Sequence, residues 1–127
     1  MITVDGVHHV AVNVTDLERA REFYAYVLGL EETSRPAFDF AGAWFRVGPQ
    51  QIHLIVHAVE GPRGNGEIDT RRRHIALRVH SYRQTRDHLR TLDVPCIDRP
   101  RNKTPWPQIY VADPDGNVIE LSADVLD

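Results

Sequence analysis

The two halves of the chain repeat one pattern, and this repeat constrains the fold more than any other feature. The segment HVAVNV at residues 9–14 alternates like a strand and leads into a polar helix start, and HIALRV at 74–79 does the same 65 residues later. Near the end of each half, QIHLI at 51–55 matches VIELS at 118–122. The chain is therefore predicted to contain two copies of one structural unit.

Each copy is predicted to have the order β-α-β-β-β. Both helices start at capping-box spacing, Thr15 with Glu18 and Ser81 with Gln84, and the first stops at Gly29. Pro95 forbids continuation of the second helix. The expected strands are 7–14, 31–36, 42–48 and 50–57 in the first copy, and 73–80, 95–99, 106–112 and 117–122 in the second.

Length and composition are those of a single domain of 127 residues. We expect modules at about 5–58 and 73–123, joined by a glycine-rich linker at about 59–72.

We expect a cytoplasmic protein with no membrane partner. The chain has a single cysteine, no apolar signal region and no apolar run near 20 residues. A net charge of −3 without a basic face argues against nucleic acid.

Four candidate metal ligands occupy the matched positions: His9 and His53 in the first copy, His74 and Glu120 in the second. Alternate residues of a strand share a face, and a pseudo-two-fold relation between the copies would bring all four to one concave surface. Three imidazoles and one carboxylate suit a divalent Zn, Ni, Co, Mn or Fe(II) ion better than calcium or magnesium. His8, the neighbour of His9, is expected to point to the opposite face.

Several motifs together resemble the vicinal oxygen chelate superfamily, which includes glyoxalase I, fosfomycin-resistance proteins, extradiol dioxygenases and bleomycin-resistance proteins. They are the strand-to-helix motif at 9–20, VLGL at 27–30 and DPDGNVIEL at 113–121. The stretch 35–55 is most similar to small glyoxalase-like members. The resemblance implies an α+β fold of two βαβββ modules forming a curved half-barrel cleft. It also implies a homodimer, the four ligands named above, and Glu120 as the catalytic proton carrier.

Other polar and aromatic residues are candidates for binding the substrate. Ligand clefts favour aromatic walls, and arginine suits an anionic group. The candidates are Arg35, Trp44, His57, Arg78, Trp106 and Tyr110.

The leading functional hypothesis is a metal-dependent lyase or isomerase of the glyoxalase type, whose ion binds vicinal oxygens of a small substrate. Bacterial-type glyoxalase I commonly has a glutamate at the position of His53, so the resemblance does not assign glutathione-thiohemiacetal isomerisation. Two alternatives stay open. One is an extradiol-type dioxygenase that uses Fe(II), and the other is a bleomycin-resistance-like protein that binds a drug without catalysis.

Overall fold

The structure is a computed structural model that describes residues 1–57 and 67–127. The chain divides into two compact units, Met1–Gly61 and Pro62–Asp127. Each unit is described by itself. Among the described residues, no helix is long and apolar enough to cross a membrane.

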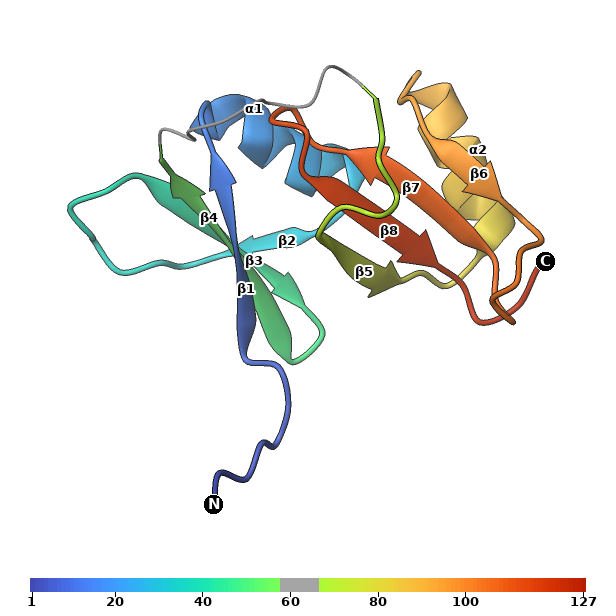
Figure 1. The fold of residues 1–127 in the computed structure, drawn as a ribbon. Coiled ribbons are helices and arrows are strands. Elements are labelled where there is room, and N and C mark those ends of the chain that lie inside the picture. Colours follow the sequence, from blue (N-terminus) through green and yellow to red (C-terminus); the bar gives the residue numbers. More distant parts are fainter. Residues whose placement is uncertain (58–66) are drawn as a thin grey trace. The chain divides into compact units, whose positions relative to one another are not determined.

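The first unit has the predicted βαβββ order (Figure 1). Its elements are β1 (His9–Val14), α1 (Leu17–Glu22), the π-helical turn η1 (Phe23–Val27), β2 (Glu31–Thr33), β3 (Gly42–Val47) and β4 (Gln50–Val56). The sheet order is β1-β4-β3-β2, with β1 parallel to β4 and the other pairs antiparallel. The valine face of β1 packs inward as predicted, since Val12 and Val14 are buried with Tyr24, Phe45 and Leu54.

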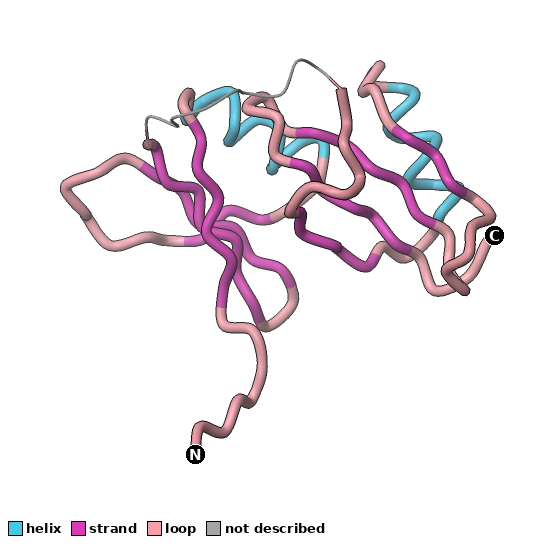
Figure 2. The backbone as a smooth tube through the Cα atoms, viewed as in Figure 1, coloured by secondary structure: helices cyan, strands magenta, loops and turns pink. Residues whose placement is uncertain are grey.

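The second unit repeats this topology (Figures 1 and 2). Its elements are β5 (His74–Arg78), α2 (Tyr82–Thr91), β6 (Ile97–Arg99), β7 (Gln108–Ala112) and β8 (Val118–Ser122). The sheet order is β5-β8-β7-β6, with β5 parallel to β8 and the rest antiparallel. Leu89, Ile109, Val111 and Ile119 form its buried core. The fold class expected from the sequence, α+β with two βαβββ modules, is confirmed.

The first helix differs from the sequence prediction at its N-cap. Asp16, not Thr15, caps α1: its Oδ1 accepts a hydrogen bond from the backbone N of Arg19 at 3.2 Å. A carboxylate accepts such bonds strongly and complements the positive helix end, so Asp16 is the better cap. The helix then widens into η1, which buries both Phe23 and Tyr24. It ends at Gly29, whose φ of +70° is a conformation that glycine adopts without strain.

The second helix begins at the predicted cap, Ser81, whose hydroxyl accepts a hydrogen bond from the backbone N of Gln84 at 3.1 Å. Asp127 adds a second cap that the sequence did not reveal. Its carboxylate accepts hydrogen bonds from the Ser81 hydroxyl and from the backbone N of Arg83, the latter at 2.9 Å. These bonds, led by that of Ser81, hold the pKa of Asp127 below its ordinary value of 3.8.

We expect Asp127→Asn to lower the melting temperature at neutral pH, and the difference to vanish in acid. The pKa of Asp127 is lower in the folded state, so its contribution is present above the unfolded pKa and is lost as pH falls through the folded pKa. Thermal melts of both proteins from pH 7 down to pH 3 check this. A difference that grows toward acid pH would contradict the role of the carboxylate.

Gly42 in β3 lies against the neighbouring strand and leaves no room for a side chain. A Cβ at this position would lie 2.3 Å from the backbone oxygen of Leu54. We expect Gly42→Ala to destabilise the fold by on the order of 1–3 kcal/mol, since the backbone must shift to relieve the clash. Chemical denaturation measures this, with Gly6→Ala as the control because a Cβ there meets nothing within 4 Å. Equal stability of the two variants would contradict the clash.

Candidate functional site

The first pair of predicted ligands meets on one face of the first sheet. In the parallel pairing of β1 with β4, Ala11 lies opposite His53, and His9 is two residues before Ala11. Residues two apart in a strand share a face, so both imidazoles project from the same side. Their rings are stacked, with centroids 4.1 Å apart and planes 18° apart. The structure thus brings His9 and His53 together, as the sequence predicts.

His53 is buried, with 9% of its surface exposed. This burial lowers its pKa, and positive charge on His9, His8 and Arg35 lowers it further. The ring of His53 is therefore held in the neutral form, which is the form that binds metals. Its Nε2 lies 2.8 Å from Oε1 of Gln51.

His8 does not point away from His9, so that prediction is wrong. The Nδ1 atoms of the two rings are 2.8 Å apart, and the rings meet edge to face. His8 precedes the first residue of β1, so the strict alternation of a strand does not fix its direction.

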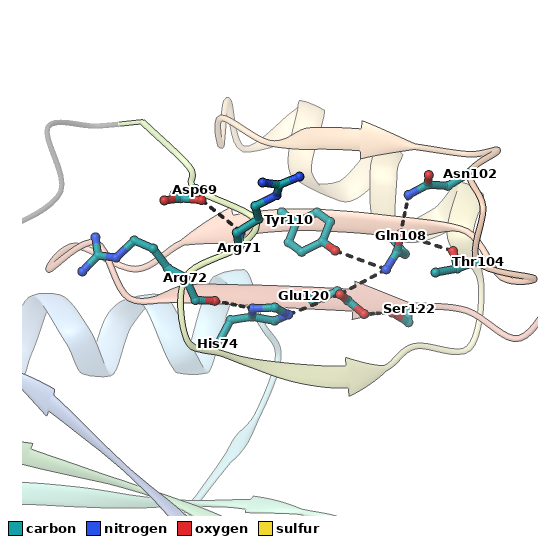
Figure 3. A network of polar contacts seen from close by, with 10 residues as sticks. All are labelled: Asp69, Arg71, Arg72, His74, Asn102, Thr104, Gln108, Tyr110, Glu120 and Ser122. Carbon is teal, nitrogen blue, oxygen red and sulfur yellow. Dashed lines mark hydrogen bonds and ion pairs between the residues drawn. The ribbon is translucent and has the colours of Figure 1, made fainter.

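The second pair meets in the second unit through the same kind of pairing (Figure 3). In the parallel pairing of β5 with β8, Ala76 lies opposite Glu120, and His74 is two residues before Ala76. His74 Nε2 is 3.4 Å from Glu120 Oε1, and His74 Nδ1 is 2.7 Å from the carbonyl oxygen of Arg72. A carbonyl oxygen only accepts, so Nδ1 donates. In the neutral ring, Nε2 then keeps its lone pair on the side of Glu120.

The two pairs therefore have the same register. His9 corresponds to His74, and His53 corresponds to Glu120. The neighbouring antiparallel strand places an aromatic residue opposite the second member of each pair: Trp44 opposite His53 and Tyr110 opposite Glu120. The Trp44 ring is stacked on His53 at 4.1 Å, and the Tyr110 ring meets the His74 ring edge to face at 5.7 Å.

Glu120 is the centre of a network of polar side chains (Figure 3). Gln108 Nε2 donates to its Oε1 at 3.1 Å, and the Ser122 hydroxyl donates to its Oε2 at 2.6 Å. The burial of Glu120 alone would raise its pKa. The bonds from Ser122, Tyr110 and Gln108, together with charge on His74, outweigh this effect and leave the pKa lowered. The carboxylate is thus held ionised in a largely enclosed position.

Gln108 and Ser122 were missed by the sequence analysis. Ser122 lies two residues after Glu120, and Gln108 lies opposite Ser122 on β7, so all three share a face. The alternation of β8 indicates that Ser122 shares a face with Glu120, but the position of Gln108 depends on how β7 pairs with β8. Gln108 Oε1 in turn accepts hydrogen bonds from the side chains of Asn102 at 2.9 Å and Thr104 at 3.3 Å.

Tyr110 keeps its proton throughout the physiological range. Burial raises the pKa of Tyr110 to about 12, and the hydrogen bond to Glu120 and the negative charge of Glu120 also raise it. Its hydroxyl also accepts a hydrogen bond from Gln108 Nε2 at 3.2 Å. A protonated phenol beside an ionised carboxylate donates to it, so Tyr110 stabilises the charge of Glu120.

The remaining predicted substrate residues differ in position. Arg78 is 80% exposed and forms an ion pair with Asp124 at 3.1 Å, so its charge already has a partner. His57 is exposed just after β4, and Trp106 is 41% exposed in the loop before β7. Arg35 lies beside Phe38 and Phe40 in the loop between β2 and β3.

Within residues 1–57 and 67–127, no group of three or more His, Cys, Asp or Glu side chains gathers as a metal site. The two pairs belong to separate compact units. Each unit therefore holds one matched pair of candidate metal donors, and each such pair is called a half-site below.

One βαβββ unit occurs twice, with a matched pair of side chains on the same strands of each copy, and this repeat defines the class of fold. The family model of the Glyoxalase/Bleomycin resistance protein/Dioxygenase superfamily matches residues 6–121. The chain belongs to this superfamily, which confirms the resemblance seen in the sequence.

Individual relatives agree with this assignment. The chain is 28% identical to metallothiol transferase FosB of Lysinibacillus sphaericus, over 98% of this chain and 86% of that protein. A protein described as a glyoxalase family member, from Bacillus anthracis, has a similar structure, with a TM-score of 0.82, 29% identity, and coverage of 97% of this chain and 98% of that one. The same fold occurs in a mutant of the fosfomycin resistance protein FosX from Listeria monocytogenes, solved with Mn(II) and 1S,2S-dihydroxypropylphosphonic acid. That match has a TM-score of 0.76 at 21% identity and covers 98% of this chain and 95% of that one.

Proposed function

We propose that this protein is a divalent-metal-dependent enzyme that acts on a small substrate with vicinal oxygens, by lyase or isomerase chemistry of the glyoxalase type. The observation that supports it most is the identical register of the two donor pairs. His9 and His53 in one unit, and His74 and Glu120 in the other, occupy equivalent positions. In this proposal all four bind one ion, within one chain or across two chains.

The residues of each half-site fit a divalent ion by their chemistry. The burial of His53 keeps its ring neutral, and His74 Nδ1 donates to a carbonyl oxygen, so the neutral form of His74 would offer Nε2 to an ion. Glu120 supplies an ionised oxygen. Imidazole nitrogen with one carboxylate suits Mn, Fe(II), Co, Ni or Zn. A bound ion of this kind would polarise adjacent substrate oxygens and stabilise negative charge that develops on them.

The protein's own residues then transfer the proton. Glu120 is ionised and takes a proton from the hydroxyl-bearing carbon next to a substrate carbonyl, then returns it to the carbonyl carbon. The hydroxyl proton moves to the former carbonyl oxygen, so the hydroxyl and carbonyl groups exchange places. Gln108 and Ser122 hold its two oxygens in place. Tyr110 is buried beside it and, with the sheet, limits the access of water.

Gln108 provides a test of this arrangement through pH. Gln108→Ala removes one hydrogen bond that lowers the pKa of Glu120, so that pKa rises. A general base must be ionised, so we expect the acidic limb of the kcat profile to move to higher pH, with a fall in kcat of about tenfold or less. Gln84→Ala is the matched control, because Gln84 is an exposed glutamine on α2. An unchanged limb in Gln108→Ala would show that the bond does not tune Glu120.

Transfer of a thiol is a second candidate reaction. The likeness to a metallothiol transferase over nearly the whole chain favours it. A screen of the Mn(II), Co(II), Ni(II), Zn(II) and Fe(II) forms with glutathione and methylglyoxal, and with fosfomycin plus thiol or water, separates the two. Turnover in the first mixture supports the isomerase, and turnover in the second supports the transferase or hydrolase.

The same screen addresses the two other classes. Cleavage of catechols by the Fe(II) form, dependent on oxygen, would establish a dioxygenase and overturn the proposal. Saturable drug binding with no turnover by any metal form would instead establish a binding protein.

We also propose that the protein is a homodimer. A monomer mass by light scattering at micromolar concentration would contradict the homodimer and leave the proposed activity untouched.

A further inference from the structure

The loop between β2 and β3 holds an arginine on two aromatic rings. The guanidinium carbon of Arg35 lies 4.8 Å from the ring centre of Phe38 and 5.0 Å from that of Phe40. The two rings are themselves stacked, with centroids 5.2 Å apart and planes 16° apart. Arg35 also donates from Nη2 to the carbonyl oxygen of Phe40 at 2.8 Å. The side chain is therefore fixed by several contacts rather than free in solvent.

Gly42 has no side chain, and this arrangement depends on that. A Cβ at Gly42 would lie 3.1 Å from Arg35 Nη2 and 3.2 Å from Nε. The guanidinium thus packs directly on the backbone at the start of β3. Because Gly42 and Phe40 both hold the group, its position is set by the fold of this loop.

The charge of Arg35 has no carboxylate partner in the part of the chain that the structure describes. Arg21, Arg78 and Arg86 each form an ion pair with an acidic side chain, and Arg35 does not. Stacking on ring faces leaves in-plane N–H groups for an acceptor, and a planar guanidinium matches a carboxylate or phosphonate well. A half-buried, fixed and uncompensated guanidinium is suited to bind an anion.

The aromatic rings continue from Arg35 to the first half-site. Phe38 is 5.2 Å from Phe40 and 6.1 Å from Trp44, and Trp44 is 4.1 Å from His53, all between ring centroids. Phe38 and Phe40 are 46% and 41% exposed, although large aromatic side chains are usually buried. Exposed rings in one row beside a polar site offer a surface to a flat apolar group.

We propose that Arg35, Phe38, Phe40 and Trp44 form a subsite for an organic anion with a flat apolar body. The carboxylate or phosphonate binds the Arg35 guanidinium, and the apolar body lies along the rings toward His53. This assignment rests on the proposed function, because it takes that body to be part of the substrate. It names a substrate class that is larger and more apolar than a three-carbon phosphonate or aldehyde.

Phenylphosphonate and methylphosphonate are the probes, because they share the anionic group and differ in the apolar body. Binding is measured by calorimetry on the full chain in excess chelator, so that no metal contributes. We expect phenylphosphonate to bind about tenfold more tightly. Arg35→Gln weakens both probes by about tenfold or more, and the double variant Phe38→Ala, Phe40→Ala weakens only phenylphosphonate. Arg46→Gln is the matched control, since Arg46 is exposed on β3 and bonds only to Thr33 among the described residues.

Equal affinity for the two probes, or equal effects of Arg35→Gln and Arg46→Gln, would overturn the subsite. A second measurement needs no variant: amide and indole NMR shifts of the unaltered protein with phenylphosphonate. Shifts at Phe38, Phe40 and the Trp44 indole support the assignment, and shifts confined to the second unit overturn it.

Mn(II) binding by the unaltered protein, measured beside its affinities for the two probes, keeps the two proposals apart. If the protein binds Mn(II) but binds phenylphosphonate and methylphosphonate equally well, the subsite is rejected and the metal enzyme is left intact. If the protein prefers phenylphosphonate but does not bind Mn(II), the subsite is supported and the metal enzyme is rejected.

Discussion

Alanine at His9 or at Glu120 will lower the affinity of the protein for Mn(II) by at least about 100-fold. Loss of a residue that only supports a ligand costs 10–100-fold, and loss of a ligand itself costs more. Each substitution leaves one donor in its own pair, His53 or His74, so the remaining set is incomplete. Metal content after dialysis, measured by elemental analysis, is expected to fall from about one ion per chain to nearly none.

His80→Ala is the matched control, because His80 is an exposed histidine outside the strands. Its metal content should equal that of the unaltered protein. Full retention of metal in both the His9 and Glu120 variants would reject the four-ligand assignment. Retention in one of them alone would reduce the site to the other three residues.

Glutamine at Glu120 will reduce kcat by about 100-fold or more while much of the metal stays bound. Glutamine keeps an oxygen donor of similar size but cannot accept a proton, and a positioned general base contributes 10²–10⁴ in rate. The readout is kcat together with metal content, on the substrate found in the metal screen. Activity should also be independent of oxygen and survive replacement of one divalent metal by another.

Glu22→Gln is the control for this prediction, because Glu22 is an exposed carboxylate on α1. It should leave kcat unchanged. A Glu120→Gln variant that retains full kcat with metal bound would remove Glu120 from the proton transfer, even if it remains a ligand.

The four candidate metal donors could be selected from the sequence because strand alternation is a local property. A period of two tells which residues share a face before any partner strand is known. The repeat then makes His9 equivalent to His74, and His53 equivalent to Glu120, without knowledge of the pairing. The structure confirms that each pair shares a face and adds the reason, which is an identical parallel register in both units.

The partners of these donors could not be selected in the same way. Gln108 is opposite Ser122 only because β7 and β8 pair in one register, and a shift by one residue would turn Gln108 to the other face. Arg78 shares a strand face with His74, as alternation predicts, but its ion pair with Asp124 depends on how the chain continues after β8. Likewise, the cap that Asp127 gives to α2 joins residues 44 apart in sequence.

By itself, the sequence determined the two βαβββ modules, the inward valine face of β1 and the four candidate ligands. These follow from hydrophobic periodicity and an internal repeat, both of which are readable along the chain. Only the tertiary structure decided the register between strands, the network that keeps Glu120 ionised, and the packing of Arg35 on Phe38 and Phe40. These depend on contacts between side chains brought together by strand pairing and loop closure, which no local pattern specifies.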